Sequence, residues 1–322
     1  MNNKPKKKHH YIPKFYLKGF TYPDPDDPDG KLCVYSKDKE HYSEVLCGVS
    51  LDAIAFEKHG YTVILSDGTM DSEIIENIFA EKESKTAPLL KKIISGQKLT
   101  DNEFSTFVSD FLAIMAVRTP KGRMMIRDKI DVILKEIDSK AIDESSFREY
   151  INNRKNQGYN IKFSEENMEK ERLKYIDIYK CYKSNSREIF EWALILSGMH
   201  EVINKDLMKM EWQICGPVKK YKFLTSDFPV IYTNEKEYAT SFLMPLSKEY
   251  CIVGSHNHIA IKKNFTDNKV KRLNSNIVQL AGRHIYCHFK EQSIYNLVKK
   301  YKNYHPKVDE LEAEELLKKN HD

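Results

Sequence analysis

The spacing of apolar residues changes twice along the chain, and each change predicts a different kind of element. Residues 31–36 and 61–65 are short apolar runs that predict strands. Across 71–94, and again after residue 100, apolar residues recur at intervals typical of one face of a helix. Beyond residue 210, β-branched and aromatic runs return. This order predicts an α+β fold: a mixed or antiparallel sheet built from N- and C-terminal strands, with a large helical central block.

The most clearly delimited helix begins with a capping box at 100–103 and ends before Pro120. On this helix Arg118 falls in phase with the apolar stripe, so its guanidinium is expected to point into the protein. A buried arginine requires an acidic partner, because an unpaired charge in the interior is strongly destabilising. Two interpretations stay open. Arg118 either forms a salt bridge with Glu83 or Asp227 that stabilises the fold, or it clamps a bound anion.

The rest of the pattern predicts one large domain followed by a tail. Further elements are expected as helices at 124–137, 165–209, 266–280 and 308–319, and as strands at 212–214, 223–224, 229–232, 241–244, 251–253 and 284–288. We therefore expect a single domain over 1–290, with a helical middle at about 71–210. A charged helical extension is expected over 291–322.

Composition narrows the class of protein without selecting a function. With 322 residues, 41% of them hydrophobic, the chain can bury a substantial core. No apolar run approaches the ~18 to 20 residues of a membrane span and no secretory signal is present, so we expect a cytoplasmic protein with no membrane partner. A net charge of +5 is compatible with nucleic acid without implying it, and a protein partner also stays open. The six cysteines include no C-x-x-C pair, which predicts reduced, mostly buried thiols.

The N-terminal segment combines histidine with an apolar, proline-fixed stretch. His9 and His10 precede Tyr11, Ile12 and Pro13, and further aromatic residues follow. A chain terminus is normally poorly ordered, but this one contains enough apolar surface to dock on a core. The imidazole of His10 is therefore expected at a fixed position in the fold.

Two glutamates share one line of the helix predicted at 71–94. Glu76 and Glu83 are seven residues apart, at the edge of the apolar stripe. Such a pair can bind a divalent cation or share a proton. Alternatively, both are solvated or paired with Lys82 and Lys85.

A polar cluster interrupts two apolar runs near residue 226. Thr225, Ser226 and Asp227 follow one run, and Pro229 begins the next. Polar residues at the end of a strand, followed by a proline, often present a carboxylate or hydroxyl at a sheet edge. The same pattern is typical of an ordinary tight turn.

Several of these segments, in this order, resemble the bacterial family DUF4238, a domain of unknown function. The resemblance covers about residues 9–288. Its motifs are His10-Tyr11-Ile12-Pro13, Tyr16-Leu17 and Phe20, Glu76 and Glu83, Arg118-Thr119-Pro120, Thr225-Ser226-Asp227-Phe228-Pro229, Met244-Pro245-Leu246-Ser247, and the region 274–286. Because the family has no established activity, the resemblance implies only that the polar residues of these motifs meet in space.

One hypothesis for these residues is a hydrolase: a metal-dependent phosphodiesterase or nuclease, an effector of a bacterial antiviral defence or toxin system. His10, Glu83, Arg118 and Asp227 are the expected catalytic residues, because they supply a base, carboxylates and a cation for phosphoryl chemistry. Metal ligands for Mg²⁺ or Mn²⁺ are expected to be Glu76, Glu83 and Asp227. Substrate contacts are expected from Tyr11, Thr225, Ser226, Asn274 and Arg283.

The alternative is a non-catalytic binding or sensor module. No P-loop, G-x-G-x-x-G, G-x-S-x-G or H-E-x-x-H motif is present. The same four residues, His10, Glu83, Arg118 and Asp227, would then form a buried polar network that stabilises the fold. Both hypotheses predict that the four converge in one pocket, with side chains no more than ~10 Å apart.

Overall fold

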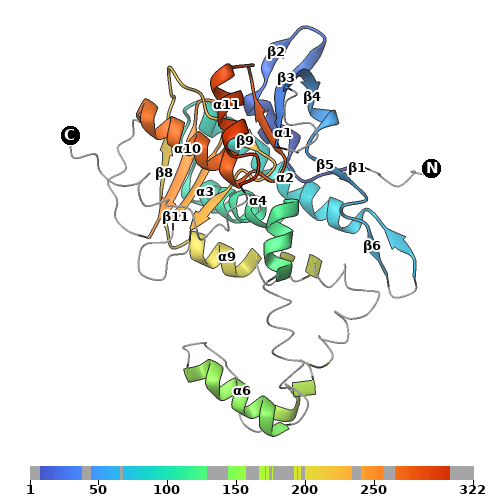
Figure 1. Cartoon of the computed structure of the whole chain (residues 1–322). Coiled ribbons are helices and arrows are strands. Elements are labelled where there is room, and N and C mark those ends of the chain that lie inside the picture. Colours follow the sequence, from blue (N-terminus) through green and yellow to red (C-terminus); the bar gives the residue numbers. More distant parts are fainter. Residues whose placement is uncertain are drawn as a thin grey trace.

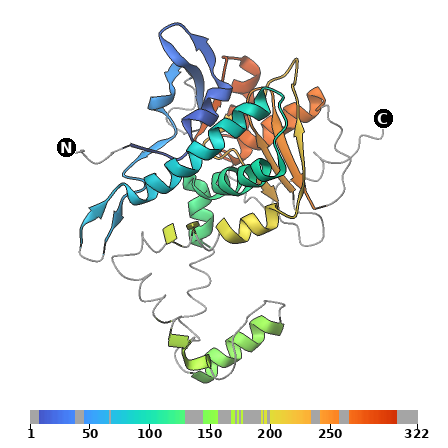
Figure 2. The ribbon, with the colours of Figure 1, turned by 180° about the vertical axis from the view of Figure 1, so that it is seen from behind.

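Strands from both ends of the chain and helices from its middle form the protein, as Figures 1 and 2 show. The α+β prediction is confirmed. The computed structural model describes residues 8–37, 45–65, 68–128, 144–156, 167–170, 172–173, 176, 192–193, 195–196, 200–233, 241–256 and 265–304. The helix predicted at 308–319 lies outside these residues, as does much of the helical stretch predicted at 165–209.

One antiparallel sheet joins the N-terminal and C-terminal strands. Its strands are β2 (Tyr22–Asp24), β3 (Asp27–Ser36), β4 (Val45–Ser50), β9 (Thr225–Ser226) and β13 (His284–Cys287). The order is β2-β3-β13-β9, and β4 pairs with β3 on the same sheet. Figure 1 accordingly shows the blue β3 near the red C-terminal segments. The predicted sheet shared by both chain ends is thus confirmed.

A second antiparallel sheet is formed by the strands after residue 210. Its order is β10-β11-β12-β8. Its strands are β8 (Glu211–Cys215), β10 (Ile231–Thr233), β11 (Ser241–Pro245) and β12 (Cys251–Ser255). All four overlap runs that the sequence predicts as strands. The strand expected at 223–224 instead lies two residues later, as β9 in the first sheet, because the backbone N–H groups of Phe223 and Leu224 donate to the Lys248 carbonyl and to Asn274 and not to a neighbouring strand.

A helical block lies beside the sheets, and Figure 2 shows α2 crossing α3 and α4. Its members include α2 (Ile74–Ile94), α3 (Asp101–Phe107), η3 (Val108–Leu112) and α4 (Ala113–Val117). Thr100 and Glu103 form the predicted capping box. Further helices among the described residues include α6 (Glu144–Asn156), α9 (His200–Leu207), α10 (Asp267–Leu280) and α11 (Gln292–Lys300). Among the described residues, no helix has the length and apolar character needed to cross a membrane.

The N-terminal segment is docked on the core, as predicted. Strand β1 (Lys8–His10) pairs antiparallel with β5 (Phe56–Lys58), and α1 (Lys14–Leu17) follows. The side chains of Ile12, Tyr16 and Phe20 are fully buried. Burial of this apolar surface holds the segment in place and with it the backbone of His10.

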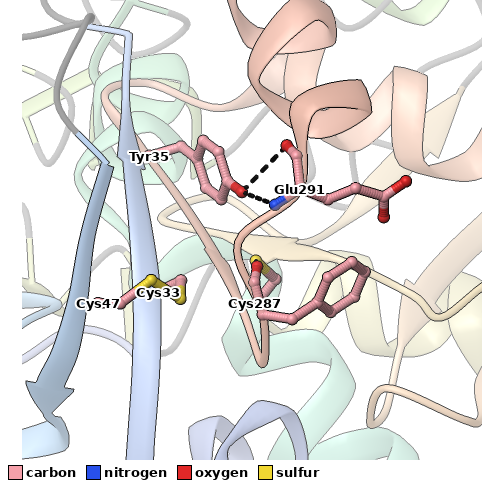
Figure 3. The surroundings of a disulfide bond; sticks show 6 residues. Cys33, Tyr35, Cys47, Cys287 and Glu291 are labelled. Carbon is pink, nitrogen blue, oxygen red and sulfur yellow. Dashed lines mark hydrogen bonds between the residues drawn. A yellow bond between two sulfur atoms is a disulfide. The ribbon is translucent and has the colours of Figure 1, made fainter.

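The prediction of reduced cysteines is wrong for one pair. Cys33 of β3 and Cys47 of β4 form a disulfide, drawn in Figure 3. The two strands are neighbours, so their pairing brings together residues 14 positions apart in the sequence. Cys287 of β13 is the register partner of Cys33 and remains a buried thiol, as do Cys215 and Cys251.

Loss of this disulfide should destabilise the protein measurably. A cross-link that closes a loop of this length contributes about 3 kcal/mol in the chain-entropy description. Cys47→Ser should therefore lower the free energy of unfolding by about 2–3 kcal/mol in urea denaturation. A reductant should destabilise the wild type by a similar amount and leave the variant unchanged. Alkylation of Cys33 and Cys47 in unfolded, unreduced protein would contradict the bond.

Candidate functional site

A cavity of about 590 Å³ lies between the N-terminal segment and helix α2. We call it the His10 pocket. Its polar lining comes from β1, α1, α2 and the C-terminal end of α4, with one carboxylate from η2 (Leu51–Ala53): Lys8, His10, Lys14, Asp52, Glu76, Glu83 and Arg118. The pocket therefore contains four of the residues that the sequence predicts as site residues: His10, Glu76, Glu83 and Arg118.

Strand alternation places the two histidines on opposite sides of β1. Lys8 and His10 face the pocket, whereas the side chain of His9 is fully buried. Nδ1 of His9 accepts a hydrogen bond from the backbone N–H of Tyr61 at 2.9 Å, and its ring stacks on the Tyr61 ring with centroids 5.1 Å apart. His9 therefore has a structural role, and His10 is the histidine available for chemistry.

The His10 imidazole has one ring nitrogen without a hydrogen-bond partner. Nε2 is shielded from solvent and makes no hydrogen bond. The ring does form a hydrogen bond with the backbone of Leu51. Burial, followed by the nearby Lys14 ammonium, lowers the pKa of His10 below its usual 6.5, although Leu51, Asp52 and Glu76 oppose the shift. His10 is therefore neutral at pH 7. Since the other ring nitrogen makes the Leu51 bond, Nε2 holds the free lone pair.

Arg118 links three parts of the chain behind the pocket. Its side chain is 3% exposed, and Nη1 donates to Oε1 of Glu83 at 2.7 Å. Nη2 donates to the backbone carbonyl of His10 at 2.7 Å and to the Tyr61 hydroxyl at 3.2 Å. The guanidinium also lies 4.4 Å from the centroid of the Phe79 ring. With its donors engaged in this way, Arg118 fits the role of a structural clamp better than that of an anion-binding group.

The two glutamates lie on one face of α2, as the helix periodicity predicts. Lys82 pairs with Asp110 and Lys85 pairs with Glu81, so neither lysine neutralises Glu83 in the way considered as an alternative. Glu83 is 32% exposed and bonds Arg118, while Glu76 lines the pocket near His10. The electrostatic effect of Glu76 favours the protonated form of His10.

Three charged residues of the pocket, Lys8, Lys14 and Asp52, are not among the site residues that the sequence predicts. Lys8 lies on the same face of β1 as His10, with its ammonium 4.5 Å from the centroid of the Phe56 ring. Lys14 forms an ion pair with Asp52 at the pocket rim, where both side chains are well exposed. The alternation of Lys8 with His10 is a signal that the sequence does contain. The Lys14 and Asp52 pairing depends on a contact between distant segments and leaves no local pattern.

Asp227 does not line the His10 pocket, in contrast to the other three residues expected to converge there. Its carboxylate accepts hydrogen bonds from the backbone N–H groups of Gly282, Arg283 and His284, at 2.8, 2.7 and 3.2 Å. Its own N–H donates to the carbonyl of His284. These bonds satisfy the carboxylate and tie it to the turn before β13, which explains why it lies there rather than at the pocket.

The predicted substrate-contact residues lie outside the His10 pocket. Thr225 and Ser226 are fully buried in β9, where the Thr225 hydroxyl bonds the Tyr16 hydroxyl at 2.7 Å and the Ser226 hydroxyl stabilises the following turn.

The other three predicted contact residues are Tyr11, Arg283 and Asn274. Tyr11 is buried, and its pKa is raised by burial and, to a smaller extent, by the carboxylate of Asp227. The Arg283 side chain is exposed. Asn274 accepts from the N–H of Leu224 and donates to the carbonyl of Lys222, so it secures that segment.

The predicted metal ligands do not form one set. Asp227 is bonded to backbone N–H groups, and Glu83 is bonded to Arg118. Within the described part of the chain, no group of three or more His, Cys, Asp or Glu side chains is placed to hold a metal ion. A divalent ion in the pocket stays a prediction that a metal titration can test.

Comparison with protein-family models identifies the same family that the sequence motifs resemble. The family model described as a protein of unknown function (DUF4238) matches residues 8–291 of the 322-residue chain. Comparison with curated proteins and with solved structures gives no match. The matched range begins with β1 and includes every polar residue of the His10 pocket. Since it covers most of the chain, the protein belongs to the DUF4238 family.

Proposed function

We propose that this protein hydrolyses phosphodiester bonds, with His10 as the general base. The observation that supports this most strongly is the unpartnered Nε2 of a neutral imidazole in a pocket lined by two lysines. A covered nitrogen without a hydrogen bond costs about 1–3 kcal/mol, so a substrate group or water that bonds it would recover that free energy. Because Nε2 of His10 is covered, a small shift of the pocket wall is needed before a substrate group or water can reach it.

The chemistry would use His10 and the two lysines. Nε2 of His10 takes a proton from the attacking hydroxyl or water as the new oxygen–phosphorus bond forms and the opposite bond breaks. Lys8 and Lys14 would bind the phosphate oxygens and stabilise their charge. Because the Lys14 pair with Asp52 is exposed, its net contribution to stability is small, and a phosphate can displace Asp52 at little cost. Arg118 would act through its bond to the His10 carbonyl, as a positioning residue.

Nucleic acid is the substrate class that we propose, because a repeated phosphodiester can reach a pocket at the protein surface. Cleavage of DNA or RNA would suit an effector of a bacterial antiviral defence or toxin system. The direct test incubates the purified full chain with end-labelled RNA, single-stranded DNA and duplex DNA. Reactions contain Mg²⁺, Mn²⁺ or EDTA, so that a metal requirement is measured at the same time. Absence of cleavage under every condition would reject the proposal.

The rate should depend on pH in a direction set by His10. Protonation removes the base, so kcat/KM should fall on the acid side with a midpoint below pH 6.5, because the pKa of His10 is lowered. Lys14→Met removes one cause of the lowered pKa and should move this midpoint to higher pH. The measurement is kcat/KM for bis(p-nitrophenyl) phosphate between pH 4.5 and 8. A midpoint at or above 6.5 in the wild type, or an unchanged one in the variant, would contradict this assignment.

A second candidate is a non-catalytic binding module, and the environment of Arg118 favours it. Arg118 bonds Glu83, Tyr61 and the His10 carbonyl, which is the arrangement expected of a network that stabilises a fold. The two candidates differ in one measurable respect. A structural network predicts that His10 variants lose stability without any activity to lose.

A further inference from the structure

A second cavity, of about 760 Å³, is separate from the His10 pocket. We call it the Lys220 cavity. It lies between the segment at 220–224, helix α10, and the chain from His288 into α11. Among the described residues, none lines both cavities. Its volume falls within the range of about 300–1,000 Å³ that small-molecule sites in proteins occupy.

One side of the Lys220 cavity is cationic. The ammonium groups of Lys220 and Lys271 lie 5.5 and 4.2 Å from the centroid of the Tyr221 ring. Lys222 forms an ion pair with Glu249 at 2.7 Å, so its charge is compensated. The one carboxylate of the lining, Glu291, accepts a hydrogen bond from the Ser293 hydroxyl at 2.6 Å. The lining therefore has an excess of positive charge, which favours an anionic ligand.

The other side is apolar and aromatic, with a single unsatisfied polar atom. Leu224, Ile294 and Leu297 line it together with Phe289, whose ring lies 4.3 Å from the His288 ring between centroids. Nδ1 of His288 is covered and makes no hydrogen bond, so a ligand can bond it after a small shift of the cavity wall. Burial, followed by the ammonium groups of Lys248 and Lys222, lowers the pKa of His288 to about 4. The imidazole is thus neutral at pH 7 and can exchange a hydrogen bond with a neutral polar ring.

We propose that the Lys220 cavity binds a nucleoside phosphate. A ligand for this site needs a flat body for the wall formed by Phe289 and the aliphatic residues, a hydrogen-bonding atom for His288, and a negative charge for Lys220 and Lys271. A heterocyclic base supplies the first two, because every base has a face that stacks and an edge that hydrogen-bonds. A phosphate supplies the charge. This proposal does not depend on the phosphodiesterase proposal, since the two sites share no residue.

The test measures binding of ATP, AMP and GTP to the full chain by isothermal titration calorimetry. We expect one nucleotide to bind per chain, and the double variant K220E/K271E to weaken that binding by about tenfold or more, equivalent to at least about 1.4 kcal/mol. Lys299→Glu, at an exposed position of α11 outside the cavity, is the matched control and should leave affinity unchanged. Thermal unfolding verifies that all variants fold.

Three further results decide the proposal. His10→Gln should bind nucleotide as tightly as the wild type, and loss of binding in that variant would place the ligand in the His10 pocket instead. Equal affinity of K220E/K271E and wild type would overturn the assignment. So would binding of laurate or anilinonaphthalene sulfonate that no nucleotide displaces, since the cavity would then be a site for apolar anions.

Discussion

His10→Gln should reduce phosphodiester cleavage by about 10²- to 10⁴-fold, the usual contribution of a general base. Glutamine is close to histidine in size and polarity, but it cannot accept a proton from an attacking nucleophile at neutral pH. The backbone of His10 is held independently of its side chain, by pairing with Phe56 and by the bond from Arg118 to its carbonyl. The variant should therefore keep the wild-type fold while losing kcat. The measurement is single-turnover cleavage of the labelled nucleic acid.

His256→Gln is the matched control for this variant. His256 forms a hydrogen bond through Nε2 with the carboxylate of Asp206 and does not line the His10 pocket, so the same substitution there should leave the cleavage rate unchanged. A His10→Gln protein that cleaves at the wild-type rate would remove His10 from the mechanism. One that no longer unfolds cooperatively would instead favour the structural network, because the imidazole would then be needed for folding.

The sequence predicts the site well where the periodicity of a helix determines the direction in which a side chain points. A capping box and an apolar stripe fix the phase of the helix that leads to Arg118, and this phase points Arg118 inward. The same reasoning on α2 places Glu83 at the edge of the buried face, and of the two partners expected for Arg118, Glu83 or Asp227, it is Glu83 that pairs with it. Apolar residues in the N-terminal segment likewise predict its docking on the core. Each inference needed only the residues of one continuous segment, although the segment that leads to Arg118 includes the π-helical stretch η3 between α3 and α4.

The sequence does not predict the position of a residue where that position depends on strand pairing between distant segments. Asp227 lies beside the turn at Gly282 because β9 pairs with β13, a contact across more than fifty residues. Lys37 is only 3% exposed because its ammonium donates to the carbonyls of Val278 and Ala281 at the end of α10. A lysine in a sequence predicts a solvated charge, and only the register of β3 against β13 brings this one under the helix end.

Arg118→Met should be the most destabilising single change in the pocket, lowering the free energy of unfolding by about 3–5 kcal/mol. Methionine fills much of the same volume against Phe79, so the decrease in the free energy of unfolding reflects the lost polar contacts more than lost packing. The substitution leaves the His10 carbonyl without one of its two donors and the Glu83 carboxylate without its cation. Glu83 is partly exposed and can be solvated, which places the expected value toward the lower end of this range. Urea denaturation followed by circular dichroism measures it.

Two further variants, Arg118→Lys and Arg127→Met, distinguish the loss of the Arg118 hydrogen bonds from the loss of a positive charge. Lysine keeps the charge but has one terminal nitrogen in place of the two with which Arg118 separately bonds Glu83 and the His10 carbonyl, so Arg118→Lys should be intermediate in stability. Arg127 is exposed, and its replacement by methionine should change stability by no more than about 0.5 kcal/mol. If Arg118→Met matched Arg127→Met, the clamp would be energetically unimportant. The guanidinium would then be free to exchange Glu83 for a substrate phosphate, and Arg118 would act as an anion-binding group instead of a positioning residue.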